Sequence, residues 1–256
     1  MSKALQIKLK TKTQADIYNE KVNKALQTYP FADISPSLMI KINPRAKRMA
    51  LRVDTHRRVV NLVVPKRGSL RSAYRFALEH EYWIRQKVAE MPEVINYQDG
   101  VTLTILGEKI KIKVNFDTKH KKTTVEINDG TLQVTTNKKD PSSRIRRFII
   151  NHAKEHLTAL SHKKAALINK KIHSVTVRDT SSRWGSCSSE QKLSYSWRLI
   201  FAPMDAFDYV VAHEVSHLQH MDHSPNFWHL CEDLSANYSR GKTWMKRHSQ
   251  DLIRYA

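Results

Sequence analysis

Short apolar stretches with alternating polar positions fill much of the first half of the chain. A first group comprises SLMIKI (37–42), RMALRVD (48–54) and VVNLVVP (59–65), and a second comprises VTLTIL, KIKIKVNF, TTVEI and TLQVTT between residues 101 and 136. Alternation at every second residue is typical of a β-strand with one buried face. Asn128-Asp129-Gly130, between the last two stretches, predicts a hairpin turn.

Other segments repeat their apolar residues at helical spacing. Ser69 is placed to cap a long helix over 69–91, and Pro92 is placed to end it. Further on, Leu193–Phe201 is expected to be a strand that could pair with an extended peptide. The remaining predicted elements are a weak helix at 13–28, a long helix at 140–169, a strand at 172–177, a loop at 183–189, and helices at 204–221, 224–236 and 239–254.

The pattern changes from mainly strands to mainly helices near residues 138–142. We therefore expect an α+β protein with two regions: a basic, β-rich region with one long helix at 1–140, and a mainly helical region with a small sheet at 141–256. A chain of 256 residues is long enough for one large domain or two small ones.

The net charge of +20 is unevenly distributed. Residues 201–256 contain five Lys or Arg and seven Asp or Glu, so the excess of positive charge lies in residues 1–200. Such a surface suits nucleic acid or another acidic partner. The alternative is a basic surface that only keeps the protein in solution.

Composition also indicates the cellular compartment in which the protein is expected. No apolar run approaches the roughly 20 residues that cross a bilayer, and no apolar block follows the first lysines, so neither a membrane span nor a signal peptide is expected. The two cysteines, Cys187 and Cys231, form no CxxC pair. We therefore expect a cytoplasmic protein without a disulfide framework.

The stretch HEVSHLQHMDH (213–223) holds four histidines and one glutamate within eleven residues. On a helix, His213 and His217 lie one turn apart on the same face and can bind one metal ion. Glu214 then projects along the rim of the site and can take a proton from a water on the metal. This HExxH arrangement predicts a zinc site with a catalytic base, and its alternative is a surface helix that is merely rich in histidine.

Catalytic zinc usually has a third protein ligand. His220 would share the face of His213 if the helix continued, whereas His223 requires the chain to leave the helix first. Asp222-His223-Ser224-Pro225 resembles a helix break followed by a new helix start, which favours His223. Cys187 is a weaker candidate, because three histidines already suffice.

Three ordered blocks carry a resemblance to a known family: TVRDTSSRWGSCSS (176–189), SYSWRLIFAP (194–203) and DYVVAHEVSHLQHMDHSPNFW (208–228). Together they resemble the YgjP-like zinc metallopeptidases, which are more distantly similar to the SprT-like group. The resemblance implies a zincin-like metallopeptidase domain in 141–256, with zinc on His213, His217 and His223 and Glu214 as catalytic base. The SYSW block departs from the L-N-W expected in that strand, which leaves the chemistry unchanged.

Arg183 and Trp184 allow two interpretations. They could line a substrate cleft, with Arg183 holding a carboxylate or carbonyl, or a tight turn at Gly185 could brace the motif helix. Arg198 is expected to pair with an acid such as Asp208, and Phe227 and Trp228 are expected in the core.

The predicted function is zinc-dependent hydrolysis of peptide bonds in a protein or peptide substrate. Two other functions stay open: a nucleic-acid-associated protein or protease that acts on DNA- or RNA-bound proteins, and a zinc-stabilised module without enzymatic activity.

Overall fold

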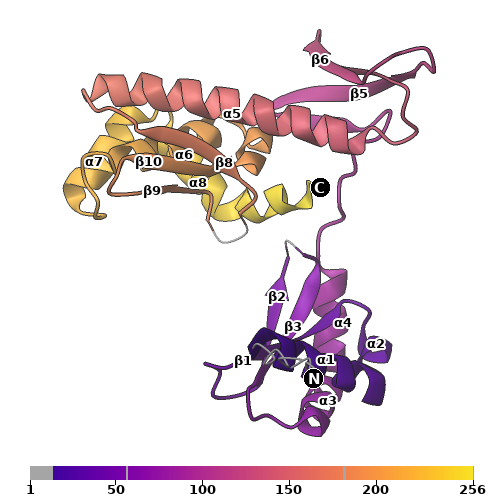
Figure 1. Ribbon diagram of the computed structural model, residues 1–256. Helices are drawn as coiled ribbons and strands as arrows, with labels where there is room; N and C mark the ends of the chain where they lie inside the picture. The colour runs from indigo at the N-terminus through magenta and orange to yellow at the C-terminus, as the bar shows by residue number, and fades with distance from the viewer. Residues whose placement is uncertain (1–13, 56, 181–182, 256) are drawn as a thin grey trace, which may run out of the picture. The chain divides into compact units, whose positions relative to one another are not determined.

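The alternating stretches form the strands of two separate sheets in the computed structural model, which describes residues 14–55, 57–180 and 183–255 (Figure 1). The chain divides into two compact units between Met91 and Pro92. The composition change near residue 140, where the sequence predicts a domain boundary, lies inside the second unit. There Ile112 and Leu132 of one sheet share a core with Ile145 and Ile149 of the following helix.

The first unit packs helices against a three-stranded sheet. Strand β3 (Val59–Pro65) lies in the centre, parallel to β1 (Leu38–Asn43) and antiparallel to β2 (Ala50–Asp54). The sheet follows α1 (Gln14–Thr28) and α2 (Phe31–Ile34) and precedes α3 (Leu70–Glu79) and α4 (Glu81–Ala89). The core of this unit comprises Phe31, Ile34, Leu38, Val60, Leu62, Val64, Ala73, Ala77, Ile84 and Met91.

The single helix predicted over 69–91 is in fact two helices. Ser69 caps the first as predicted, since its hydroxyl accepts a hydrogen bond from the amide of Ser72. At His80 the backbone leaves helical geometry, with φ −113° and ψ 15°. The His80 ring nitrogen Nδ1 bonds to the Phe76 carbonyl at 2.8 Å and so helps to satisfy the end of α3.

The second unit begins with a four-stranded sheet. Its strands are β4 (Thr102–Ile105), β5 (Glu108–Phe116), β6 (Thr124–Asn128) and β7 (Thr131–Thr136), in the order β4-β5-β7-β6. The predicted hairpin turn is confirmed, because Asp129 and Gly130 both have positive φ, 47° and 69°, between paired β6 and β7. Leu106 and Gly107 form a similar turn between β4 and β5 that the sequence analysis missed.

The rest of the second unit carries the histidines. The long helix α5 (Ser142–Leu167) precedes a three-stranded sheet of β8 (Ser174–Arg178), β9 (Gly185–Cys187) and β10 (Lys192–Ser196), in the order β8-β10-β9. The chain continues through the 3₁₀-helix η1 (Trp197–Phe201), α6 (Met204–Ser216), α7 (Pro225–Leu234), α8 (Tyr238–His248) and η2 (Ser249–Arg254). The fold is therefore the expected α+β class, with most sheet in the first half and mainly helices towards the C-terminus.

The strand predicted over Leu193–Phe201 is wrong beyond Ser196. The chain there turns into η1, whose five residues are all buried. An apolar run of this length fits a buried strand and a buried 3₁₀-helix equally well, so periodicity does not distinguish them. The helix predicted over 204–221 likewise ends early, at Ser216.

Two ion pairs tie the elements of this unit together. Arg198 was expected to pair with Asp208, but it bonds to Asp179 and to the Tyr255 carbonyl, because η1 turns its side chain towards the end of β8. Asp208 on α6 instead faces Lys164 of α5, with 2.5 Å between the charged atoms. Both members of this second pair are buried, and Asp208 also accepts hydrogen bonds from Ser235 and Ala236.

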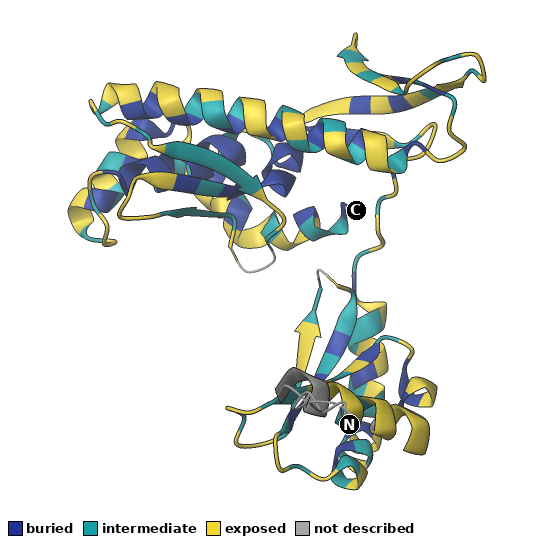
Figure 2. Cartoon of the chain, viewed as in Figure 1, coloured by how far each residue is buried: buried dark blue, intermediate teal, exposed yellow. Residues whose placement is uncertain are grey.

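Helix α6 is largely buried (Figure 2). Nine of its thirteen residues are buried, including the acidic residues Asp208 and Glu214. None of the helices in the described part of the chain combines the length and the apolar composition that crossing a membrane requires.

Candidate active site

The end of α6 presents the first two histidines of the motif. His213 lies in the last turn of the helix, and His217 directly follows its last residue, Ser216. The chain then makes a short turn and enters α7 at Pro225, with the Asp222 carboxylate accepting from the Ser224 amide at 3.4 Å. This loop brings His223 back over the end of α6.

His213, His217 and His223 form a cluster whose potential ligand atoms all lie within 4.8 Å of one another. The two Nε2 atoms of His213 and His223 are 3.3 Å apart. Two nitrogens bound tetrahedrally at the usual zinc–nitrogen distance of about 2.0–2.1 Å would be separated by about 3.3–3.4 Å. The spacing therefore fits a tetrahedral metal ion.

His220, the alternative third ligand, contributes its backbone instead. Its carbonyl oxygen lies 2.9 Å from Nδ1 of His217. With the proton on Nδ1, this bond orients the imidazole and leaves Nε2 of His217 available to a metal. The sequence analysis missed this contact, because a backbone carbonyl leaves no mark in a side-chain pattern.

The surroundings of His213 and His217 favour their uncharged imidazoles. Burial, together with the neighbouring His217 and His223, lowers the pKa of His213 to about 4. Burial also lowers the pKa of His217. A metal ion binds neutral imidazole, so these two side chains are ready to bind near neutral pH without losing a proton.

Aromatic rings pack around the cluster. The ring of Phe227 lies 4.5 Å from that of His217 and 4.9 Å from that of His213, measured between centroids, and Phe227 is fully buried, as predicted. Trp228, also expected in the core, is only half-buried, and its ring centroid lies 5.5 Å from that of His223. These rings restrict the orientations of the imidazoles.

Tyr238 and Lys242 stand beside the cluster on α8. The Lys242 ammonium donates to the Tyr238 hydroxyl at 2.7 Å and lies 4.5 Å from the Trp228 ring. Tyr238 packs edge-to-face on Tyr209, whose ring is 6.2 Å from that of His213. The four-residue spacing of Tyr238 and Lys242 marks them as neighbours on one helix, but only the fold brings them beside the histidines.

Glu214 lies outside the histidine cluster and against strand β9. A Cβ atom added to Gly185 would overlap the Glu214 carboxylate, so the strand passes directly over this side chain. Glu214 is only 5% exposed, and its burial raises its pKa to about 8, which the nearby positive charge of Arg183 opposes. The structure thus places a buried carboxyl group one residue from a potential metal ligand.

Gly185 was interpreted as part of a tight turn, but it belongs to β9. It is required there because any side chain would displace Glu214. Trp184 supports the same strand, since its carbonyl accepts from the Ser196 amide of β10 at 2.9 Å. Arg183 is exposed two residues before β9, and its charge acts on Glu214.

The position of β9 corrects the expected peptide-binding strand. β10 is the central strand, paired on both sides, so its edges are not available. Among the described strands, β9 pairs with β10 alone. Trp184 and Ser188 bond to β10 through their backbones, in the hydrogen bonds Ser196 N–Trp184 O and Ser188 N–Lys192 O. In an antiparallel pair every second residue bonds to the partner strand, so the backbone N–H and C=O groups of Gly185 and Cys187 point to the open edge of β9.

Within the described part of the chain, Cys187 is not a member of the histidine cluster that could hold a metal ion. Burial and the nearby Glu214 raise the pKa of its thiol to about 11. A protonated thiol is a poor metal ligand, which agrees with a site made of three histidines.

A family model for the YgjP-like metallopeptidase domain matches residues 47–248. The chain belongs to the YgjP-like metallopeptidase family. The match confirms the resemblance carried by the three sequence blocks, and it includes the second half of the first unit as well as most of the second. No curated protein and no solved structure gives a significant match to this YgjP-like chain.

Proposed function

We propose that the protein is a zinc-dependent metallopeptidase that hydrolyses peptide bonds, with Glu214 as its general base. One observation carries the proposal: a cluster of three histidines with metal-binding geometry lies beside a buried carboxyl group that is not part of the cluster. The family match supports the same reaction class.

Zinc suits the donor set of His213, His217 and His223. Three imidazoles with this spacing leave a tetrahedral ion one open position, as in catalytic zinc sites, whereas structural zinc sites usually have four protein ligands. A zinc ion held there would polarise the scissile carbonyl and lower the pKa of a water molecule.

Glu214 supplies the proton transfer. Burial alone favours its protonated form, but the positive charge of a zinc ion beside it would favour the carboxylate, which can accept a proton from the attacking water. The same carboxylic acid can then donate that proton to the leaving amine. Its buried position excludes competing solvent from this transfer.

The open edge of β9 suits an extended substrate. The outward backbone groups of Gly185 and Cys187 can pair with a peptide strand, as in β-augmentation. A peptide on this edge would run beside Glu214, because Gly185 contacts that carboxylate. Arg183, two residues before the strand, is then positioned to line the cleft.

Two other functions make different demands on the site. A zinc-stabilised module without activity would need no carboxyl group beside its metal, so the buried Glu214 disfavours it. A protease that acts on nucleic-acid-bound proteins would use the same catalytic site and add the basic residues as a docking surface.

A peptide-library cleavage assay tests the proposal. The full chain loaded with zinc should cleave a subset of peptides, lose that activity with a chelator and regain it when zinc is restored. Calcium added in place of zinc serves as the control, because it prefers oxygen ligands. The absence of cleavage across a library of all residue pairs, by protein that carries zinc, would contradict the proposal.

A further inference from the structure

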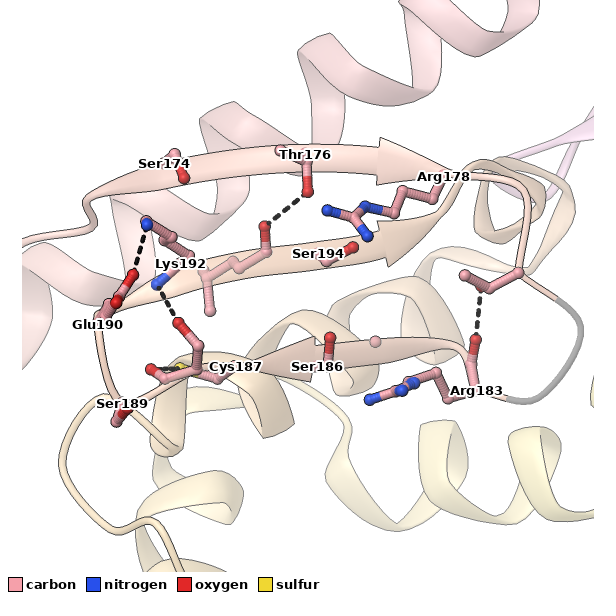
Figure 3. Close-up of a pocket in the computed structure, with 14 residues that line it drawn as sticks. Ser174, Thr176, Arg178, Arg183, Ser186, Cys187, Ser189, Glu190, Lys192 and Ser194 are labelled. Atoms are coloured by element: carbon pink, nitrogen blue, oxygen red, sulfur yellow. Dashed lines mark hydrogen bonds and ion pairs between the residues drawn. The ribbon is translucent and has the colours of Figure 1, made fainter. Parts of the chain in front are cut away.

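The outer face of the β8-β10-β9 sheet forms a groove of about 580 Å³ (Figure 3). The buried Leu193 and Tyr195 of β10 lie on the opposite face of the strand from Lys192 and Ser194. The groove is lined by Ser174, Thr176, Arg178, Thr180, Arg183, Gly185, Ser186, Cys187, Ser188, Ser189, Glu190, Lys192, Leu193 and Ser194.

Hydroxyl groups form the floor of the groove. Thr176, Ser194 and Ser186 occupy matching positions on β8, β10 and β9, so their side chains form a row across the sheet. Ser186 and Ser194 are half-buried. Such hydroxyls donate readily to an anion.

Two arginines define one end of the groove. Figure 3 shows the side chain of Arg178 extending towards Ser194, while that of Arg183 runs along β9 on the side away from β10; both line the groove. Neither has a carboxylate partner among the described ion pairs, whereas the nearby Asp179 is held by Arg198 and Arg146. This end is therefore positively charged.

The other end is close to neutral. Lys192 pairs with Glu190, so its charge is compensated within the groove. The positive charge thus comes from two guanidinium groups at one end. These planar groups bind oxyanions through paired hydrogen bonds.

We propose that Arg178 and Arg183 make this groove a recognition site for acidic side chains of an extended peptide substrate. The inference rests on the proposed function, because the peptide would lie on the open edge of β9. Successive side chains of a strand point to opposite faces. Side chains on one face of the bound peptide would approach Glu214, and those on the other would lie beside Ser186 and within reach of Arg183.

The observations favour a peptide over nucleic acid as the occupant. Outward backbone groups of β9 match another polypeptide strand, whereas a phosphodiester chain has no amide to pair with them. Nucleic-acid surfaces usually neutralise many phosphates, whereas among the described lining residues only Arg178 and Arg183 are cations outside the described ion pairs. Glu190 would also repel a continuous polyanion at the far end.

Binding measured by fluorescence anisotropy tests the inference on the full chain. The probes are a labelled peptide with several glutamates, its counterpart with glutamine at those positions, and a single-stranded oligonucleotide. Wild type should bind the glutamate peptide about tenfold more tightly than the glutamine peptide, the size expected from one charge-assisted contact at an exposed site. The double variant Arg178→Gln/Arg183→Gln should lose this preference.

Lys154→Gln is the matched control, since it removes an exposed cation from α5 outside the groove, and it should keep the preference. Equal binding of both peptides by wild type, or an unchanged preference in the double variant, would overturn the inference. So would loss of oligonucleotide binding alone in the double variant.

Cleavage of the same peptides separates this inference from the proposed function. An arginine-dependent preference in binding, without any cleavage, would support the recognition site and contradict the peptidase. Cleavage of both peptides at equal rates by wild type and the double variant would support the peptidase and contradict the recognition site.

Discussion

At the residue scale, the histidine cluster depends on a short loop that returns His223 to the end of α6. The HExxH spacing predicted His213, Glu214 and His217, because one helical turn fixes their relation. The break at Asp222–Pro225 favoured His223, which the structure brings into the cluster. The His220 carbonyl and the missing side chain of Gly185 were not predicted, because both act through contacts made only in the folded chain.

Replacement of the two candidate third ligands should have unequal effects on zinc binding. His223→Ala should weaken zinc affinity by more than about 100-fold, exceeding the loss usual for a group that only supports a ligand. His220→Ala should change it by less than about tenfold, since its backbone carbonyl remains for His217. Competition titration with a chromophoric chelator measures both, and equal losses or the reverse order would contradict the assignment of His223.

At the scale of elements, strands were predicted more reliably than the ends of helices. Alternation identified the strands of the β1-β3-β2 and β4-β5-β7-β6 sheets, since a half-buried strand imposes that pattern. The turn residues Asp129-Gly130 identified the hairpin between β6 and β7. The break at His80, the end of α6 at Ser216 and the change from β10 to η1 were missed. At each of these points apolar residues continue, and tertiary packing decides the local geometry.

The buried pair Lys164–Asp208 holds α5 against α6 and the start of the segment after α7. Lys164→Met should destabilise the second unit by about 3 kcal/mol or more, because it leaves Asp208 buried without a cation. Lys163→Met, at the exposed neighbouring position, should change stability by less than about 0.5 kcal/mol. Urea unfolding followed by tryptophan fluorescence is the measurement, since four of the five tryptophans lie in the second unit. Equal stability of the two variants would show that the pair is not stabilising.

For the whole molecule, the excess positive charge and the histidine motif lie in different parts of the sequence. The excess positive charge lies in residues 1–200, and the histidine motif lies after them. The distribution of charged residues establishes this separation, but it does not identify a binding partner for the basic residues, because a basic surface can serve solubility alone.

We expect the basic part to bind nucleic acid, with affinity that falls steeply as salt rises. Each phosphate neutralised should contribute about 0.9 to the slope of log affinity against log salt for duplex DNA. Arg45→Gln/Lys47→Gln/Arg48→Gln, at exposed positions of the first unit, should reduce this slope. Titration of DNA and RNA at several salt concentrations is the test, and no binding at low salt would leave the charge a solubility feature.

The most direct test of the central claim compares Glu214→Gln with wild type on a peptide that the wild type cleaves, with zinc content measured on the same samples. Glu232→Gln, at an exposed position of α7, is the matched control. Glu214→Gln should keep its zinc and lose hydrolysis by at least about 10²–10⁴-fold, the usual contribution of acid–base catalysis, while Glu232→Gln keeps both. Hydrolysis at the wild-type rate by Glu214→Gln with full zinc would contradict the account.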